Sequence, residues 1–260
     1  MNKTSLRMKK ILCLPVLAGF FMVSCDDDSV SSQFNDSNED AAKKLIEKVE
    51  FDSAQIDEQD YVLTVEYDAN NRVTSVSNGE DTGTLAYSNN QLSTVTGGEE
   101  PFSIDELYQS PYDLFEDGDV LEYDQNGNPS VISVFEYGWE YIDNNWVEVV
   151  EEYIATLTYD QTPNPYYYTF DAAGLIDVMD RVQLNFDMSG QPSDIIKAKA
   201  LFPVNNIKSI TYADEDGAVV GSVEMDYVYD TDNYPTSATF IVRSEGEPNA
   251  IYSAIYTYKQ

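Results

Sequence analysis

The chain has 260 residues, of which 47 are acidic and 14 basic, so its formal charge is −33. Hydrophobic residues make up 42% and aromatic residues 13%, which excludes a disordered acidic tail. The charge also excludes nucleic acid as a favoured partner, because phosphate backbones would be repelled. The chain has no histidine and only two cysteines, Cys13 and Cys25.

The N-terminal region has the layout of a signal peptide. Lys3, Arg7, Lys9 and Lys10 precede the apolar run 11–23, and no acid occurs before residue 26. As a helix this run would span only about 20 Å, whereas a bilayer core is about 30 Å thick. We therefore expect residues 1–24 to be a signal peptide that is removed, not a transmembrane anchor.

The segment Met22-Val23-Ser24-Cys25 resembles the lipobox of bacterial lipoproteins. This resemblance implies that Cys25 is lipidated and that two or three acyl chains attach the protein to a membrane. The alternative is ordinary cleavage that leaves Cys25 as a free thiol, but the large Met22 disfavours it. Without the four cations of the signal peptide the formal charge becomes −37.

Residues 25–44 begin with Asp26-Asp27-Asp28 and continue with a polar stretch to Asp40. We expect this segment to be a flexible acidic tether of roughly 20 Å. An acid run after the cysteine resembles the surface-export signal of Bacteroidota lipoproteins, which implies an outer membrane lipoprotein at the cell surface. In enterobacteria an aspartate at this place implies inner-membrane retention, so a periplasm-facing location stays the alternative.

From about residue 45 one unit recurs, in which alternating strand residues end in an aromatic residue and turn formers follow. Aspartate accepts hydrogen bonds from backbone N–H groups, Asn and Gly tolerate positive φ, and the ring covers the neighbouring strand. Each unit is therefore predicted to be a hairpin corner. The units are Tyr67-Asp68-Ala69-Asn70-Asn71, Tyr87-Ser88-Asn89-Asn90, Tyr123-Asp124-Gln125-Asn126-Gly127, Tyr159-Asp160, Phe186-Asp187 and Tyr229-Asp230-Thr231-Asp232-Asn233.

This spacing predicts an all-β domain over residues 45–260. We expect a single large antiparallel up-and-down meander of a dozen or more strands, strongly curled or barrel-like, with one or two short helices. The alternation of polar and apolar residues implies one covered face and one wet face. A division into two domains near 160–165 is the alternative.

Four segments carry more specific expectations. A capping box at 103–106 predicts a helical turn to about Gln109, and residues 174–180 have helical spacing. The second half of 39–49 alternates as a strand. The C-terminal segment 251–258 is aromatic and low in charge, which favours a paired strand over a bare edge.

Four further motifs are Val120 to Pro129, Tyr159-Asp160 with Pro163 to Tyr166, Asn205-Asn206-Ile207, and Tyr229 to Thr236. Together they resemble an uncharacterised family of Bacteroidota lipoproteins with YD-like repeats and a porin-like β meander. The resemblance implies the fold and the envelope location, and no activity.

Clustered oxygen ligands make calcium the first candidate ligand, at the turns that begin at Asp124, Asp214 and Asp230. The EF-hand template fails, because its twelfth position falls on Met225 for the second turn and on Ile241 for the third. Hairpin turns explain all three, so we expect no metal site and no cofactor.

Carbohydrate is the second candidate. Trp139, Tyr141 and Trp146 lie in one predicted hairpin and are the expected ligand-stacking residues. Tyr166-Tyr167-Tyr168 is a further aromatic segment. The alternative is that all these rings serve cross-strand packing.

Catalysis is not expected. Without His, and without Cys once Cys25 is lipidated, only a glycosidase-like pair of carboxylates remains feasible, and nothing in the sequence singles out a pair. We therefore expect a non-catalytic envelope module with a glycan or protein partner.

Overall fold

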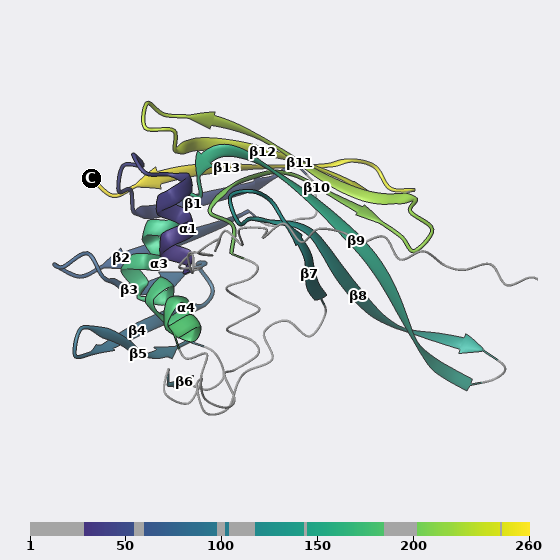
Figure 1. Ribbon diagram of the computed structural model, residues 1–260, viewed down its shortest axis with the longest axis horizontal. Helices are drawn as coiled ribbons and strands as arrows, with labels where there is room; N and C mark the ends of the chain where they lie inside the picture. The colour runs from purple at the N-terminus through teal and green to yellow at the C-terminus, as the bar shows by residue number, and fades with distance from the viewer. Residues whose placement is uncertain are drawn as a thin grey trace, which may run out of the picture.

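The computed structural model describes residues 29–54, 60–97, 102–103, 118–142, 145–184, 202–244 and 246–260. These residues form one 13-stranded sheet (Figure 1). Its strands are β1 (Ile46–Ser53), β2 (Tyr61–Tyr67), β3 (Val73–Ser77), β4 (Thr82–Ser88), β5 (Gln91–Thr96), β6 (Phe102–Ser103), β7 (Gly118–Tyr123), β8 (Pro129–Ile142), β9 (Asn145–Pro163), β10 (Asn205–Ala213), β11 (Val219–Tyr229), β12 (Pro235–Ser244) and β13 (Ala250–Tyr258).

The sheet consists of two meanders, β1 to β6 and β7 to β13, joined by antiparallel pairing of β1 with β13. Among the described residues it is open, with β6 and β7 at its two edges. The predicted antiparallel up-and-down meander is confirmed, and the sheet is strongly curved (Figure 1). The alternative division near 160–165 is wrong, because β9 runs to Pro163 within the same sheet.

Three helices are described: α1 (Val30–Ser37), α3 (Tyr167–Ala173) and α4 (Leu175–Leu184). The predicted helix at 174–180 is confirmed by α4. Gly174 separates α3 from α4 with φ of 80°, and a Cβ there would lie 3.1 Å from Leu92 Cβ. The helical turn predicted after Ser103 lies outside the described residues. In the described part of the chain no helix is long and apolar enough to span a bilayer.

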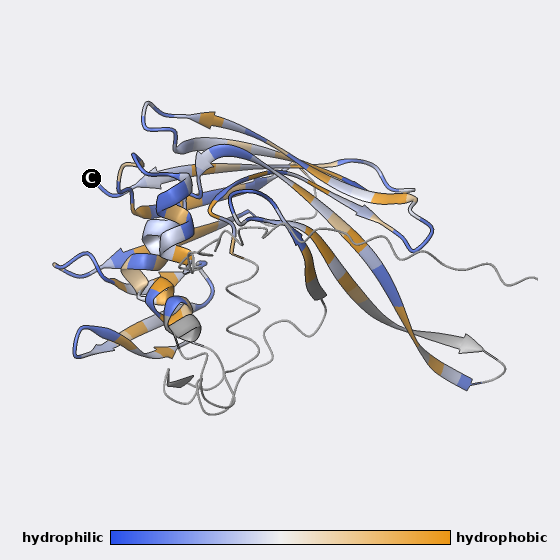
Figure 2. Cartoon of the chain, in the orientation of Figure 1, coloured by the Kyte–Doolittle hydropathy of each residue, from blue (hydrophilic) through white to orange (hydrophobic). Residues whose placement is uncertain are grey.

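The core lies between the helices and one face of the sheet. Apolar and polar residues alternate along the strands (Figure 2), so each strand presents one apolar side. Val49, Val65 and Ala254 are buried in one cluster with Ala173 at the end of α3. The second cluster joins the three helices with the segment before β10 and contains Val30, Phe34, Tyr167, Ile176, Met179, Phe202 and Val204.

The tether predicted over residues 25–44 is wrong for its described part, from residue 29 onward. Ser29 caps α1, and both Val30 and Phe34 are fully buried. The Phe34 ring stacks on Tyr167 at 3.5 Å between centroids. The Asp180 carboxylate accepts hydrogen bonds from the Val30 backbone N–H at 2.7 Å and from the Ser31 hydroxyl at 2.5 Å. Helix α1 is therefore part of the folded body.

Three of the predicted hairpin corners, and the turn that begins at Asp214, share one five-residue geometry. The first residue is an aspartate whose Oδ1 accepts the N–H groups of the third and fifth residues, and the fourth residue has positive φ. Four turns have it: Asp68–Arg72, Asp124–Asn128, Asp214–Ala218 and Asp230–Tyr234. The carboxylates that suggested calcium are thus acceptors within turns. No group of three or more acidic or cysteine side chains that could hold a metal occurs among the described residues.

Tyrosines at the strand ends lock neighbouring hairpins together. Each donates its hydroxyl to a backbone carbonyl on an adjacent strand end, and the donors and acceptors are Tyr67 to Ile46, Tyr87 to Val73, Tyr159 to Pro129, Tyr227 to Ile207 and Tyr258 to Pro235. Because two strands separate successive units, most corners fall at the same end of the sheet, beside the helices. The interpretation as a structural corner is confirmed for the units that begin at Tyr67, Tyr87, Tyr123 and Tyr229. Tyr159-Asp160 lies inside β9, and Phe186-Asp187 lies outside the described residues.

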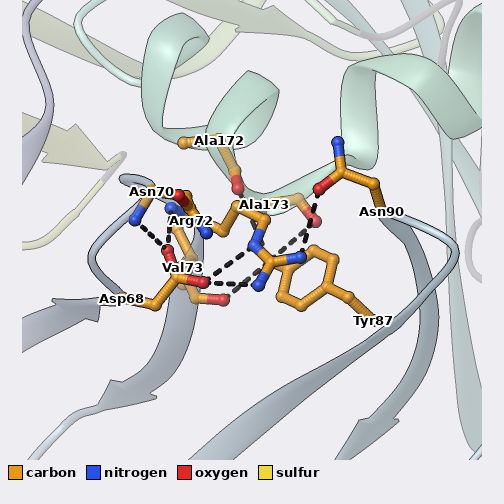
Figure 3. A network of polar contacts seen from close by, with 8 residues as sticks. All are labelled: Asp68, Asn70, Arg72, Val73, Tyr87, Asn90, Ala172 and Ala173. Carbon is orange, nitrogen blue, oxygen red and sulfur yellow. Dashed lines mark hydrogen bonds and ion pairs between the residues drawn. The ribbon is translucent and has the colours of Figure 1, made fainter.

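Cations cover several of these rings. Arg72 donates to Asp68 Oδ2 at 2.8 and 2.6 Å and to Asn90 Oδ1 at 3.2 Å, and its guanidinium carbon lies 4.7 Å from the Tyr87 ring centroid (Figure 3). The Tyr87 hydroxyl also approaches the carbonyls of Ala172 and Ala173, so this network ties two hairpins to α3. Similar pairs are Lys43 with Tyr168, Lys44 with Tyr234 and Tyr258, and Lys259 with Tyr67.

Replacing Phe34 by Ala should lower the free energy of unfolding by about 3 to 5 kcal/mol, because it removes a fully buried ring. Asp36→Ala, at an exposed position of the same helix, should change it by less than about 0.5 kcal/mol. Chemical denaturation of both variants measures the difference. Equal stability of the two would mean that residues 29–40 are a tether after all.

The raised pKa values of tyrosines at the corners predict that the folded protein loses stability at alkaline pH. Burial raises the pKa of Tyr87 and of Tyr229 to about 12, and it raises the pKa of Tyr67 and Tyr159 as well. Since an unfolded tyrosine has a pKa of about 10, this contribution is complete below that pH and is lost as the pH rises toward 12 and above.

The melting temperature should therefore be constant up to about pH 10 and fall steeply above it, and tyrosinate absorbance should appear over the same pH range. In Tyr87→Phe the fall should be smaller, although the melting temperature at neutral pH is lower. Ionisation of all tyrosines near pH 10 in the folded protein would contradict the corner geometry.

Candidate functional site

The asparagines of the family-like motifs are structural. Asn128 is fully buried, and its Oδ1 accepts the backbone N–H groups of Val204 at 2.7 Å and Asn205 at 3.2 Å. Its Nδ2 donates to Asp124 and to Asn205. The Nδ2 of Asn205 in turn donates to Oδ1 of Asn38, the residue that follows α1. These amides satisfy one another and the backbone in the interior, so this cluster is a joint between elements and not a ligand site.

The predicted stacking residues lie on the long hairpin formed by β8 and β9. The register places Tyr141 opposite Trp146 and Trp139 opposite Glu148. Residues paired in this way belong to one face of a hairpin. The Trp146 side chain is 67% exposed. The ligand-stacking role of Trp139, Tyr141 and Trp146 stays a prediction.

The other predicted positions have separate outcomes. Cys25 lies outside the described residues, so its lipidation stays a prediction. The aromatic segment at 166–168 is not a surface platform, because Tyr167 is buried in α3 against Phe34 and Tyr168 donates a hydrogen bond to the Ala41 carbonyl.

A cleft at the end of β1 and β2, away from the helices, is a candidate site. We call it the Phe51–Tyr61 cleft. Its first part is a cavity of about 340 Å³ on the apolar face of the sheet, lined by Phe51, Asp52, Ser53, Tyr61, Val223, Phe240, Val242 and Tyr252. Its second part, about 630 Å³, is lined by Glu50, Phe51, Asp52, Asp60, Tyr61, Val62, Asn78, Gly79 and Glu80. Phe51, Asp52 and Tyr61 line both parts.

Strand pairing assembles the apolar part. Phe51 pairs with Tyr61 across β1 and β2, and the two rings stack at 4.5 Å with an interplanar angle of 21°. Tyr252 on β13 pairs with Ser53 on one side and with Phe240 on the other. Tyr61 is 49% exposed, so part of its ring is open to a ligand.

The second part of the cleft is acidic. Glu50, Asp52, Asp60 and Glu80 contribute carboxylates, and Asn78 contributes the amide that lies in the turn between β3 and β4. The nearby Lys48 is paired with Glu50 at 3.0 Å. Asp60 Oδ1 accepts the Ser53 backbone N–H at 3.0 Å, which joins the end of β1 to the start of β2. The cleft therefore offers hydrogen-bond acceptors and repels anions.

The sequence did not indicate this site. Phe51 and Tyr61 were indistinguishable from other strand residues, because their meeting depends on the register of the β1–β2 hairpin. Val223, Phe240 and Tyr252 come from the second meander and meet Phe51 only because β1 pairs with β13.

No protein-family profile and no curated protein sequence matches the chain. Among solved structures it is similar to a porin-like protein from Bacteroides vulgatus, with 13% identity and a TM-score of 0.39, over 83% of this chain and 99% of that chain. A porin-like protein from Bacteroides uniformis shows 12% identity and a TM-score of 0.35 over 84% and 99%. A LolA superfamily protein from Nitrosomonas europaea shows 12% and 0.27 over 88% and 91%. At these scores the likeness carries no information about ligand or activity.

The exposure of Trp146 predicts charge-selective quenching of its fluorescence. Residues 129–163 contain seven acids and no Lys or Arg, so cations should gather around this hairpin. In Trp139→Phe, which leaves Trp146 as the one indole, caesium should quench more strongly than iodide at low ionic strength, and the difference should shrink at high salt. Blue-shifted emission that resists both ions would show that Trp146 is covered.

Proposed function

We propose that the protein is a non-catalytic binding module of the bacterial envelope and that the Phe51–Tyr61 cleft holds a neutral carbohydrate. The observation that carries the proposal is the sharing of Phe51, Asp52 and Tyr61 by an apolar and an acidic cavity. A ligand in this cleft meets rings on one side and acceptor oxygens on the other.

Sugars fit this combination of groups. The C–H face of a pyranose packs on an aromatic ring, and its hydroxyls donate to carboxylate and amide oxygens. Tyr61 supplies a partly exposed ring, while Asp52, Asp60 and Asn78 supply oxygens beside it. Uronic acids and sulfated glycans would be disfavoured by the four carboxylates that line the acidic cavity.

The location is part of the same proposal. The signal-peptide layout of 1–24 and the lipobox-like 22–25 support an outer membrane lipoprotein attached through Cys25. The acid run at 26–28 supports the cell surface, with a periplasm-facing orientation as the alternative. A surface module that retains neutral glycans would serve a glycan-uptake system.

Tyr61→Ala should weaken glycan binding about fivefold or more, since packing of a sugar C–H face on an aromatic ring is worth on the order of 1 kcal/mol. Tyr123→Ala is the matched control, because Tyr123 is 50% exposed but lies on β7 outside the cleft. Calorimetric titration with neutral tetrasaccharides of glucose, xylose and mannose, and with a uronic acid oligomer, measures both variants.

Failure of every neutral oligosaccharide to bind, or equal losses in the two variants, would contradict the carbohydrate proposal. Binding that survives Tyr61→Ala but is abolished by Trp146→Ala would move the site to the β8–β9 hairpin. Tighter binding of the uronic acid oligomer than of the neutral sugars would overturn the electrostatic argument.

A further inference from the structure

The outer part of the β8–β9 hairpin extends beyond the sheet. Strand β8 pairs with β7 only up to Val134, and β9 pairs with β10 only from Ile154 onward. Residues 135–142 and 145–153, which we call the arm, lie beyond these pairings and pair with one another. Figure 1 shows the arm projecting away from the curved sheet. Eight residues of strand correspond to about 26 Å.

The arm exposes apolar side chains on both faces. Trp146 is 67%, Val147 42% and Val150 50% exposed. Trp146 and Val150 share one face by alternation and Val147 belongs to the other, so the sheet covers neither face fully. Two-stranded ribbons are marginal in water unless another surface packs on them. Exposed apolar residues gathered on such a ribbon indicate a docking surface.

The negative charge of the arm favours a positively charged partner. Residues 135–142 and 145–153 carry five acids and no base, and no Lys or Arg occurs anywhere between Arg72 and Arg181. A second copy of the chain would bring like charges together, which disfavours pairing of two arms. A surface with Lys and Arg side chains would instead complement the carboxylates and place cations near the indole and phenol rings.

We propose that the arm is a docking element for a basic protein surface. The partner places Lys or Arg side chains beside the carboxylates of the arm and covers the exposed Trp146 and Val150. This site is separate from the Phe51–Tyr61 cleft and does not rest on the carbohydrate proposal.

The two tryptophans of the chain, Trp139 and Trp146, both lie in the arm, so tryptophan emission reports on the arm alone. The probe is a synthetic peptide of alternating lysine and valine, with the corresponding glutamate and valine peptide as the like-charge control. Titration of the lysine peptide into the protein should give a saturable blue shift of emission. The apparent Kd should rise about tenfold or more between low and physiological salt.

Two pairs of matched variants test the surface. Glu151→Lys in the arm should weaken binding about tenfold, whereas Glu215→Lys in the exposed β10–β11 turn should not change it. Val150→Thr should weaken binding several-fold, whereas Val219→Thr, at a position 62% exposed outside the arm, should leave it unchanged.

Thermal unfolding of each variant shows whether it is folded before binding is compared. Absence of an emission change at low salt, equal binding of the glutamate peptide, or equal losses in the arm variants and their controls would each overturn the proposal. Because tyrosine without tryptophan lines the cleft, none of these outcomes depends on whether the cleft binds sugars.

Discussion

The pairing of β1 with β13 is the constraint on which the rest of the structure depends. It joins Ile46 to Tyr258, almost the whole length of the domain apart, and it turns two meanders into one sheet. Without it, the face under α3 and α4 would be divided, and Phe51 would not meet Phe240 or Tyr252. We expect this distant contact to form after the local hairpins, because closing a long loop costs more chain entropy than closing a short one. The corners, which depend on local contacts, would then shape each meander before β1 and β13 pair.

The corners do so by combining three modest interactions at one end of the sheet. An aspartate organises three of the turns, a tyrosine hydroxyl reaches the neighbouring strand, and a cation often covers the ring, as Arg72 covers Tyr87 (Figure 3). Each is worth about 1 kcal/mol or less by itself. Repetition along the sheet makes the helix-covered end rigid. The opposite end has the Asp214–Ala218 turn but none of the five tyrosine hydrogen bonds described above, and it carries the cleft. This end and the arm carry the apolar surface that a ligand or partner can use.

Much of the fold was encoded locally and could be predicted. The five-residue turns depend on hydrogen bonds within the turn, and strands such as 251–258 show their alternation in the sequence. Helix α1 could not be recognised, because Val30 and Phe34 stand in a polar stretch and become buried only against Tyr167 and α4. The cleft was equally invisible, since it requires both a hairpin register and the β1–β13 contact. Of the predicted stacking residues, Trp146 lies exposed on the arm, but the sequence could not show that this hairpin leaves the sheet.

The docking of α1 also limits how the protein can move if Cys25 carries lipid. Only residues 26–28 separate that cysteine from Ser29, the first capped position of the fold, and a fully extended chain of this length spans about 14 Å. The folded domain would then lie close to the lipid headgroups, and its rotation relative to the membrane would be restricted. The end of the sheet beside the helices would face the bilayer, because α1 packs at that end. The Phe51–Tyr61 cleft would face away from the bilayer, because it lies at the other end of β1. A ligand would then reach the cleft from the aqueous side, because Phe51 lies near the end of β1 that is farther from the helices.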